Sequence, residues 1–520
     1  MVSSQCLPLK TVSFRRLIVC LSVLPFCVAG AIEASSGKAS KNSIALPPAA
    51  PNVLLIVTDE HNFRTLGCYR DTMAREQSNM WGIGAVVETP HLDQLAAEGV
   101  LCTRAYATSP VCSPCRAALI TGRYPHATGV PQNNEILDRS VPTLADRLNS
   151  EGYRTAFIGK WHLAGNGKPE WAPTVDGGFQ NKTFMFNRGH WKKFDIKDGV
   201  PFVAAEQKGQ PSYGLQNANQ KTFSTDWLTD RAIEFITDTE AAKPFFTVVS
   251  YPDPHGPNSV RAPYDHMYDD LPYLAPRTYG QKGVKPKWVA ARNHPVFRGQ
   301  DMSKYFGMVK CLDDNIGRLL QQMKAAGRLD NTLIIMTSDH GDLCYEHDRV
   351  NKGNPYEGSA RIPLILRHPG QIAAGEFYTK PIGSVDVTPT IMGLLNLQAD
   401  PENHGRDLSA ELVDASKSAG VKTSEAITFL RIGGKDARWI AAVDSRYKLV
   451  LSVDDEPWLF DAKTDPDELQ NLYGTAGKAD VVKRLAEALK GYAQRTQDPH
   501  LKEGKIAQSL EAVLSHSIPR

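Results

Sequence analysis

One twelve-residue run carries the clearest chemical signal in the sequence: Cys112-Ser-Pro-Cys-Arg-Ala-Ala-Leu-Ile-Thr-Gly-Arg123. Pro114 is typical of a first helical turn and Gly122 of a helix end, so we expect a short helix with Cys112 just ahead of its N-terminus. Free backbone N–H groups and the positive end of the helix dipole gather there and favour a tetrahedral anion. Arg116, one turn further on, adds a planar cation. The run therefore predicts a potentially reactive side chain facing an anion-binding site.

Two short polar clusters follow predicted strands and are candidates for a metal site. Asp59 and Glu60 come directly after one apolar run, and Asp339 and His340 come directly after another. Carboxylate oxygens at one point favour Ca²⁺, Mg²⁺ or Mn²⁺ as the bound ion. Taken alone, either cluster is more often a helix cap or a solvated loop.

Four further basic residues stand at strand ends or in stiff loops. Lys160 and His162 leave a predicted strand two residues apart, so both can face the same side of the chain. His255 follows another predicted strand between two prolines, and Lys352 precedes the phrase Tyr-Glu-Gly. A single Lys or His is usually a surface group or a satisfied structural group, so these residues need support from their neighbours.

Taken together, these motifs resemble those of the type I sulfatases of the alkaline phosphatase-like superfamily. The run from Cys112 resembles the signature C/S-x-P-x-R, and residues 152–162 match the second signature of that family. Residues 352–363 match the family phrase K-x-x-x-Y-E-G-x-x-R-x-P, and the resemblance spans residues 51–475 in family order. The Asp-His form of the second metal pair is the one seen in iduronate-type and choline-type sulfatases.

The resemblance implies a sulfuric ester hydrolase. In that family a maturation enzyme oxidises the signature cysteine to Cα-formylglycine, whose hydrate is the nucleophile, so Cys112 is the expected modified residue. The implied catalytic residues are Cys112, Arg116, Lys160, His162, His255 and Lys352. The implied metal ligands are Asp59, Glu60, Cys112, Asp339 and His340. The expected ion is Ca²⁺, with Mn²⁺ and Mg²⁺ as alternatives.

The resemblance also suggests a role for each group. Asp339 takes or orients the proton of the nucleophile, His255 protonates the departing alcohol oxygen, and His162 deprotonates the remaining hydroxyl. Three cations are expected to hold the sulfuryl oxygens: Arg116, Lys160 and Lys352. Two positions depart from the family pattern. Cys115 replaces a small Ser, Thr or Ala, and Glu60 replaces a second Asp.

Several alternatives stay open at this point. The same superfamily contains phosphonate monoester and phosphodiester hydrolases, which are one alternative function. A more distant alternative is a non-catalytic protein that binds sulfated glycans. Cys112 and Cys115 form a CxxC pair that a disulfide, a redox site or half a zinc site would also use.

The expected substrate is a sulfated small molecule or carbohydrate held in a pocket. Residues 190–193 (His-Trp-Lys-Lys) are one candidate wall for it.

The elements that must position these residues alternate along the chain. Continuous apolar runs at 52–57, 245–250, 333–337 and 362–366 are typical of strands buried on both faces. Amphipathic segments lie between them, one opening at Thr89-Pro90 and a longer one at about 303–326. This alternation predicts an α/β fold: a doubly wound, mostly parallel sheet flanked by helices.

We divide the chain into a catalytic domain, residues 51–415, and a C-terminal α+β subdomain, residues 416–520. Four short strands and one helix predict a small antiparallel sheet in the latter. Residues 165–225 are polar, aromatic and rich in glycine, and we expect an insertion near the mouth of the site.

The N-terminus predicts export. Basic residues, an apolar core and small residues near Ala29 indicate a signal peptide, residues 1–31, followed by a flexible leader, residues 32–50. We therefore expect a secreted or periplasmic protein without a membrane span. The formal net charge of +2 gives no indication of a nucleic-acid partner.

Overall fold

The computed structural model describes residues 50–238, 243–288, 295–414, 426–433 and 438–515. The predicted signal peptide lies outside the described residues, as does the predicted leader up to residue 49. None of the described helices combines the length and the apolar character that a bilayer crossing requires. The six cysteines from Cys68 onward are all free thiols.

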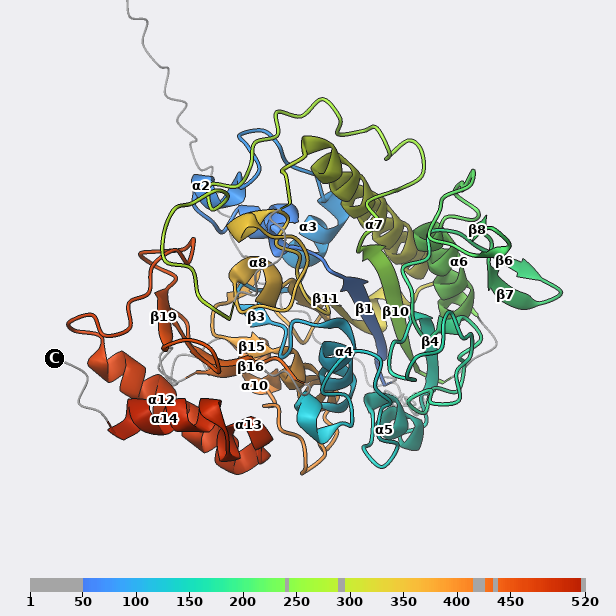
Figure 1. The fold of residues 1–520 in the computed structure, drawn as a ribbon. Helices are drawn as coiled ribbons and strands as arrows, with labels where there is room; N and C mark the ends of the chain where they lie inside the picture. Colours follow the sequence, from blue (N-terminus) through green and yellow to red (C-terminus); the bar gives the residue numbers. More distant parts are fainter. Residues whose placement is uncertain (1–49, 239–242, 289–294, 415–425, 434–437, 516–520) are drawn as a thin grey trace, which may run out of the picture. The chain divides into compact units, whose positions relative to one another are not determined.

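An eight-stranded sheet organises the chain, with the strand order β14-β2-β13-β11-β1-β10-β4-β5. Figure 1 labels β11, β1, β10 and β4 of this sheet. Its strands are β1 (Asn52–Asp59), β2 (Val100–Cys102), β4 (Arg154–Lys160), β5 (Met185–Phe186), β10 (Phe245–Pro254), β11 (Thr332–Ser338), β13 (Leu364–Arg367) and β14 (Glu376–Tyr378). All neighbouring strands run parallel except for the two pairings made by β13. The mostly parallel sheet predicted from the sequence is confirmed.

Both faces of this sheet are buried. Along β1, Leu54 and Ile56 pack into one core, whereas Val53, Leu55 and Val57 pack into the other. Alternate residues of a strand point to opposite faces, so an unbroken apolar run is the pattern such a strand needs. The first core is closed by α3 (Pro90–Ala97), α6 (Ser224–Thr237) and α7 (Gly299–Ala325). The second is closed by α4 (Cys112–Thr121), α5 (Leu144–Ser150) and α9 (Val387–Leu394).

Helix ends differ in detail from the sequence expectations. The helix α4 begins at Cys112 itself, so this residue is the first of the helix, and Gly122 ends it with φ +69°. Thr89 makes no capping hydrogen bond to α3; instead Asp313 of α7 accepts the N–H groups of His91 and Leu92. Local sequence cannot reveal a cap that comes from a distant helix.

The apolar run 362–366 is divided between two sheets. Residues 361–362 form β12, which pairs with β3 (Ala105–Tyr106) beside β15 (Ile382–Gly383). Only the residues from Leu364 onward join the large sheet, and they do so antiparallel. Two hairpins lie in the predicted insertion: β6 (Phe194–Lys197) with β7 (Val200–Val203), and β8 (Glu206–Gln207) with β9 (Gln210–Pro211).

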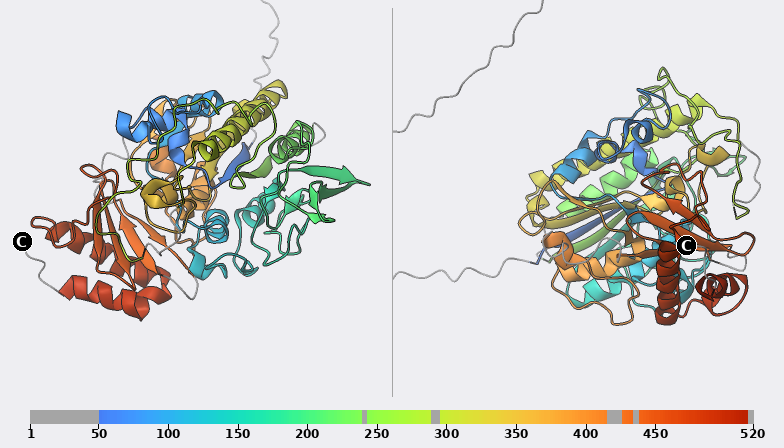
Figure 2. Two further views of the ribbon diagram at one scale, coloured as in Figure 1. Left: turned by 45° about the horizontal axis from the view of Figure 1, so that its top comes forward. Right: turned by 90° about the vertical axis from the view of Figure 1, so that its left-hand side faces the viewer.

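A second, antiparallel sheet follows the large one, as predicted. Its strands, in order, are β16 (Thr428–Arg431), β17 (Trp439–Val443), β18 (Tyr447–Ser452) and β19 (Trp458–Asp461). The predicted helix is α12 (Ala479–Thr496), and it packs on this sheet together with α14 (Lys505–Ser515), as Figure 2 shows. The other α-helices of the described residues are short: α1 (Gly67–Arg70), α2 (Arg75–Ser78), α8 (Glu357–Ala360), α10 (Ser409–Val413) and α13 (Pro499–Lys502). The domain boundary proposed near residue 415 falls outside the described residues and stays a prediction.

The sheet brings the chemistry-bearing residues to one edge. Asp59 is the last residue of β1 and Lys160 the last of β4, while Asp339 and His255 directly follow β11 and β10. These four strands are parallel neighbours, so their carboxyl ends share one edge of the sheet, where α/β folds place their ligand sites.

Candidate active site

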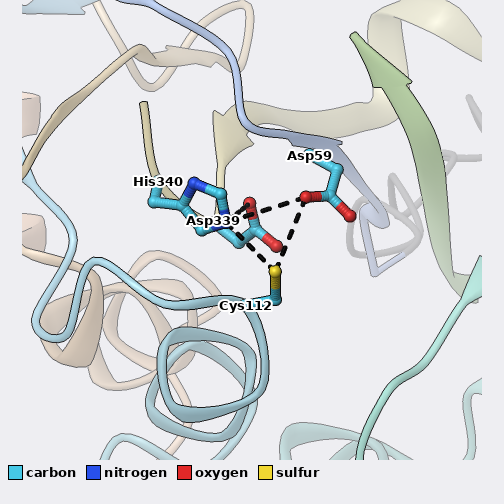
Figure 3. Close-up of side chains that lie close together, drawn as sticks. All are labelled: Asp59, Cys112, Asp339 and His340. Atoms are coloured by element: carbon cyan, nitrogen blue, oxygen red, sulfur yellow. Dashed lines mark hydrogen bonds and ion pairs between the residues drawn. The ribbon is translucent and has the colours of Figure 1, made fainter. Parts of the chain in front are cut away.

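Four buried side chains converge at this edge: Asp59, Cys112, Asp339 and His340. Their potential ligand atoms all lie within 4.8 Å of one another. Figure 3 shows the sulfur of Cys112 pointing from the start of α4 toward the two carboxylates and the imidazole. The three chain segments involved are separated by more than fifty residues, so only the fold assembles this group.

The hydrogen bonds of His340 set its orientation. Nδ1 lies 2.9 Å from the carbonyl oxygen of Gly341 and donates to it, which leaves Nε2 with a free lone pair. That Nε2 lies 3.1 Å from Sγ of Cys112 and 3.4 Å from Oδ1 of Asp339. Two carboxylates, an imidazole nitrogen and the side chain of residue 112 fit a divalent cation that prefers oxygen ligands.

The thiol of Cys112 is poorly suited to act unmodified. Burial raises its pKa to about 11, although the nearby charges of Lys160 and Lys352 oppose this. A thiol with such a pKa is protonated at neutral pH, and the thiolate is the reactive form. The position at the first turn of α4 suits an anionic group, but the cysteine itself does not supply a strong nucleophile.

Arg116 contacts four other segments of the chain beside this group. Nε lies 2.8 Å from Oδ2 of Asp339, and Nη1 donates to the carbonyl of Lys160 at 2.8 Å and to Oγ of Ser250 at 2.7 Å. Its Nη2 lies 3.4 Å from Oδ2 of Asp59. The guanidinium is buried, and its planar fork holds the two carboxylates in a fixed relation.

Lys160 adds a second buried cation, whose Nζ is paired with Asp59. Burial opposes ionisation of Asp59, but the charges of Lys160 and Arg116 outweigh it and hold the pKa of this carboxyl well below its usual range. Asp59 therefore stays a carboxylate over the whole physiological range.

Lys352, His255 and Glu60 form a neighbouring group. Nζ of Lys352 lies 2.6 Å from Nε2 of His255 and 3.3 Å from Oε1 of Glu60. Nε2 of His255 also lies 3.0 Å from Oε2 of Glu60. Burial, followed by the charge of Lys352, holds the pKa of His255 well below its usual value. Glu60, expected as a metal ligand, lies outside the converging group of four and faces these two basic residues.

His162 follows Lys160 by two residues and is buried. Its Nε2 lies 3.1 Å from Oδ1 of Asn134, and its buried Nδ1 has no hydrogen-bond partner among the described residues. Burial and then the charges of Lys160 and Arg116 hold its pKa well below its usual value, so the ring is neutral. A neutral imidazole with an open nitrogen can accept a proton.

His190 was considered from the sequence only as part of a wall. The structure places it in the site itself: its Nε2 lies 2.9 Å from Nζ of Lys160, and its ring stacks on His255. The wall expected at 190–193 does not form as such. Trp191 and Lys192 are buried, and Lys193 donates to the carbonyl of Gln216.

Comparison with known proteins decides the family. Residues 51–397 match the family model described as Sulfatase, which is more than half of the chain. The chain belongs to the sulfatase family. A second family model, described as N-sulphoglucosamine sulphohydrolase, C-terminal, matches residues 345–495 of this sulfatase.

Curated relatives cover most of its length. This sulfatase is 30% identical to an uncharacterized sulfatase, YidJ, of Escherichia coli over 86% of the chain and 88% of the relative. It is 25% identical to an N-acetylglucosamine-6-O-sulfatase of Bacteroides thetaiotaomicron, over 86% of the chain and 87% of the relative. Together with the family match, these relatives identify the sulfatase as a sulfuric ester hydrolase.

Solved structures share the fold. A putative sulfatase of Bacteroides fragilis has a TM-score of 0.70 and 25% identity, covering 89% of this sulfatase and 98% of that chain. A protein solved in complex with its substrate D-glucosamine-2-N,6-O-disulfate has a TM-score of 0.68 and 23% identity, covering 86% and 99%. A phosphonate monoester hydrolase of Agrobacterium radiobacter has a TM-score of 0.64 and 25% identity, covering 86% and 96%.

The residues singled out from the sequence of this sulfatase thus lie together in two adjoining groups. Sequence reasoning missed the partners that hold these residues in place. Ser250 accepts a hydrogen bond from Arg116, Asn134 is hydrogen-bonded to His162, and His190 stacks on the ring of His255. Only His190 left a signal, because it stands beside an aromatic and basic run. The other two are common polar residues without a motif.

Proposed function

We propose that this sulfatase removes the sulfate ester of a sulfated carbohydrate, using residue 112 as Cα-formylglycine and one divalent cation. The observation that carries the proposal is the convergence of Asp59, Asp339, His340 and Cys112 on one buried point. These four residues would hold the cation. Formylglycine and the ion would supply a strong oxygen nucleophile and an electrophile for the sulfuryl oxygens.

The basic residues of the chain bind the sulfuryl group. Lys160 is the last residue of β4 and Lys352 lies in the loop before α8, and both lower the pKa of residue 112 in its cysteine form. Arg116, fixed to Asp339 by its Nε, adds positive potential from below. Fixed cations aimed at developing negative charge are usually the largest catalytic contribution.

Two histidines move protons in the proposed reaction. His255 is oriented by Nδ1, which donates to the carbonyl of Gly256 at 2.8 Å, so Nε2 faces the site, 3.0 Å from Oε2 of Glu60. The ring takes up a proton at Nε2 and passes it to the departing alcohol oxygen, and its low pKa makes the protonated ring a ready donor. His162 is a neutral ring with an open Nδ1 and takes the proton that must leave residue 112 before sulfate is released.

The substrate class rests on relatives. The N-acetylglucosamine-6-O-sulfatase and the structure with a disulfated glucosamine both have names that specify sulfated amino sugars. The ligand set, carboxylates with one imidazole, favours Ca²⁺ with Mn²⁺ and Mg²⁺ as alternatives.

We also propose export through the predicted signal peptide. N-terminal sequencing of the native protein tests this, and a mature chain that still begins at Met1 contradicts it.

A phosphonate monoester or phosphodiester hydrolase is the second candidate. It is favoured by the Asp339-His340 pair and by the structural likeness to the phosphonate monoester hydrolase. Rates on 4-nitrophenyl sulfate and on an aryl phosphonate monoester separate the two. A higher kcat/KM for the phosphonate would reverse the order of the two proposals.

The modification is tested by mass spectrometry of the peptide that contains residue 112, purified from its native host. We expect the mass of an aldehyde in place of a thiol, and Cys112→Ala is expected to lose turnover. The matched control is Cys68→Ala, which removes a half-buried thiol outside the site. An unmodified thiol in fully active enzyme would contradict the proposal.

A further inference from the structure

The rings of His190 and His255 lie face to face at the edge of the site. Their centroids are 3.4 Å apart, and their planes differ by only 8°. His190 comes from the insertion at 165–225 and His255 from the loop after β10, so two distant segments meet here. Both rings are mostly covered, with 21% and 14% of their side-chain surface exposed.

His190 is itself held in place from its far edge. The ammonium of Lys160 donates to its Nε2 at 2.9 Å, which fixes the rotation of the ring. Burial and then the charge of Lys160 hold the pKa of His190 well below its usual value, so the ring is neutral and adds no repulsion to the cations around it.

The same segment also forms hydrogen bonds to the loop that carries His255. Two residues after His190, the buried Nζ of Lys192 donates to Oδ1 of Asp253 at 2.6 Å and to the carbonyl of His255 at 3.0 Å. The segment therefore contacts His255 at two points, one on the main chain and one on the face of the ring.

The other contacts of His255 act only at its edges. Nδ1 donates to Gly256, and Nε2 lies between Glu60 and Lys352. Edge contacts of this kind leave the ring free to tilt about the line that joins its nitrogens. A flat neighbour at van der Waals distance removes that freedom, and the only ring stacked on this face among the described residues is His190.

We propose that His190 is a positioning residue: its ring holds the plane of His255 so that Nε2 points at the leaving-group oxygen. The inference rests on the proposed role of His255 as the acid. A group that donates its proton in the transition state must keep a fixed distance and direction to the atom that receives the proton. A small misplacement of the donor lowers the rate of the reaction.

The test uses a series of phenyl sulfates whose substituents change the leaving-group acidity. An activated leaving group such as 4-nitrophenol needs no proton, whereas phenol does. For His190→Ala we expect kcat/KM to fall about tenfold on phenyl sulfate and less than about twofold on 4-nitrophenyl sulfate. His190→Phe, which keeps a flat ring, is expected to recover most of the loss on phenyl sulfate.

His255→Ala serves as the reference and is expected to show the same selectivity in a stronger form. The double variant, His190→Ala with His255→Ala, is expected to lie within about twofold of His255→Ala alone, because His190 acts through His255. His266→Ala is the matched control, since its side chain is 74% exposed and lies outside the site.

Three results overturn the proposal: equal losses on all phenyl sulfates for His190→Ala, additive losses in the double variant, or no leaving-group selectivity in His255→Ala. Thermal melting of each variant separates a folding defect from a loss of positioning. A failure of the proposed carbohydrate substrate shows differently, as a lack of sulfate release from sulfated sugars with the phenyl sulfate series unaffected.

Discussion

Oε2 of Glu60 lies 3.0 Å from Nε2 of His255, so the acidic residue that follows Asp59 pairs with His255 and lies outside the converging group of four. Glu60 has φ +63°, so the extended backbone of β1 ends here, and its N–H donates to Oδ1 of Asp339 at 3.2 Å. Burial raises the pKa of Glu60, and the charge of Lys352 offsets part of this.

Glu60→Gln is therefore expected to leave metal affinity within about threefold of the wild type and to lower kcat about tenfold, because the variant weakens the charge-assisted contacts to His255 and Lys352. Metal content by elemental analysis and steady-state kinetics measure the two effects. If Glu60→Gln loses the metal as completely as Asp59→Ala, Glu60 is a ligand after all.

Arg116→Lys is expected to lower kcat/KM at least about 100-fold and to destabilise the fold by about 3 kcal/mol. A lysine cannot reach Asp339, the Lys160 carbonyl and Ser250 at once, so buried acceptors lose their donors. Arg123→Lys is the matched control, because Arg123 belongs to the same run but pairs with Asp400 and Glu402 near the surface. Kinetics and urea unfolding give the readouts, and equal effects of the two variants would contradict the assignment.

Removal of the metal by a chelator is expected to abolish turnover, and Ca²⁺ is expected to restore it. Asp339→Ala removes one carboxylate of the group, so we expect at least about 100-fold weaker metal binding. Asp71→Ala, which removes an exposed carboxylate, is the control. Titration of the metal-free protein, followed by calorimetry, measures the affinity. Full activity in a preparation shown by elemental analysis to be metal-free would falsify the metal site.

His61 is expected to make the protein sensitive to acid. It is fully buried between the hydroxyls of Thr58 and Thr65, and burial lowers its pKa to about 3. Below pH 6.5 the unfolded chain binds a proton that the folded one does not, so the free energy of unfolding falls as the pH falls, by about 1.4 kcal/mol per unit from this group.

His61→Gln removes this proton uptake while keeping an amide that can bridge the hydroxyls. We expect its unfolding free energy to depend less steeply on pH below 6.5, by about 1.4 kcal/mol per unit, whatever its stability at pH 7. Urea unfolding at several pH values measures the slope. An unchanged slope in His61→Gln would contradict the prediction.

The sequence by itself determined the fold class and most of the site. The unbroken apolar run of β1 can only be buried on both faces, and polar residues that follow such strands must gather at one edge of a parallel sheet. Likewise Pro114 and Gly122 bracket α4 because a proline suits the first turn and a glycine tolerates the positive φ that ends it. These are local rules, so the chain order alone reveals them.

Only the tertiary structure decided what each group faces. The direction of Glu60, the Asp313 cap on α3, and the stack of His190 on His255 all depend on segments far apart in the chain. Long-range contacts of this kind follow from packing and from the pairing of buried charges. No spacing in the sequence encodes the distance between two residues that meet only after the sheet has formed.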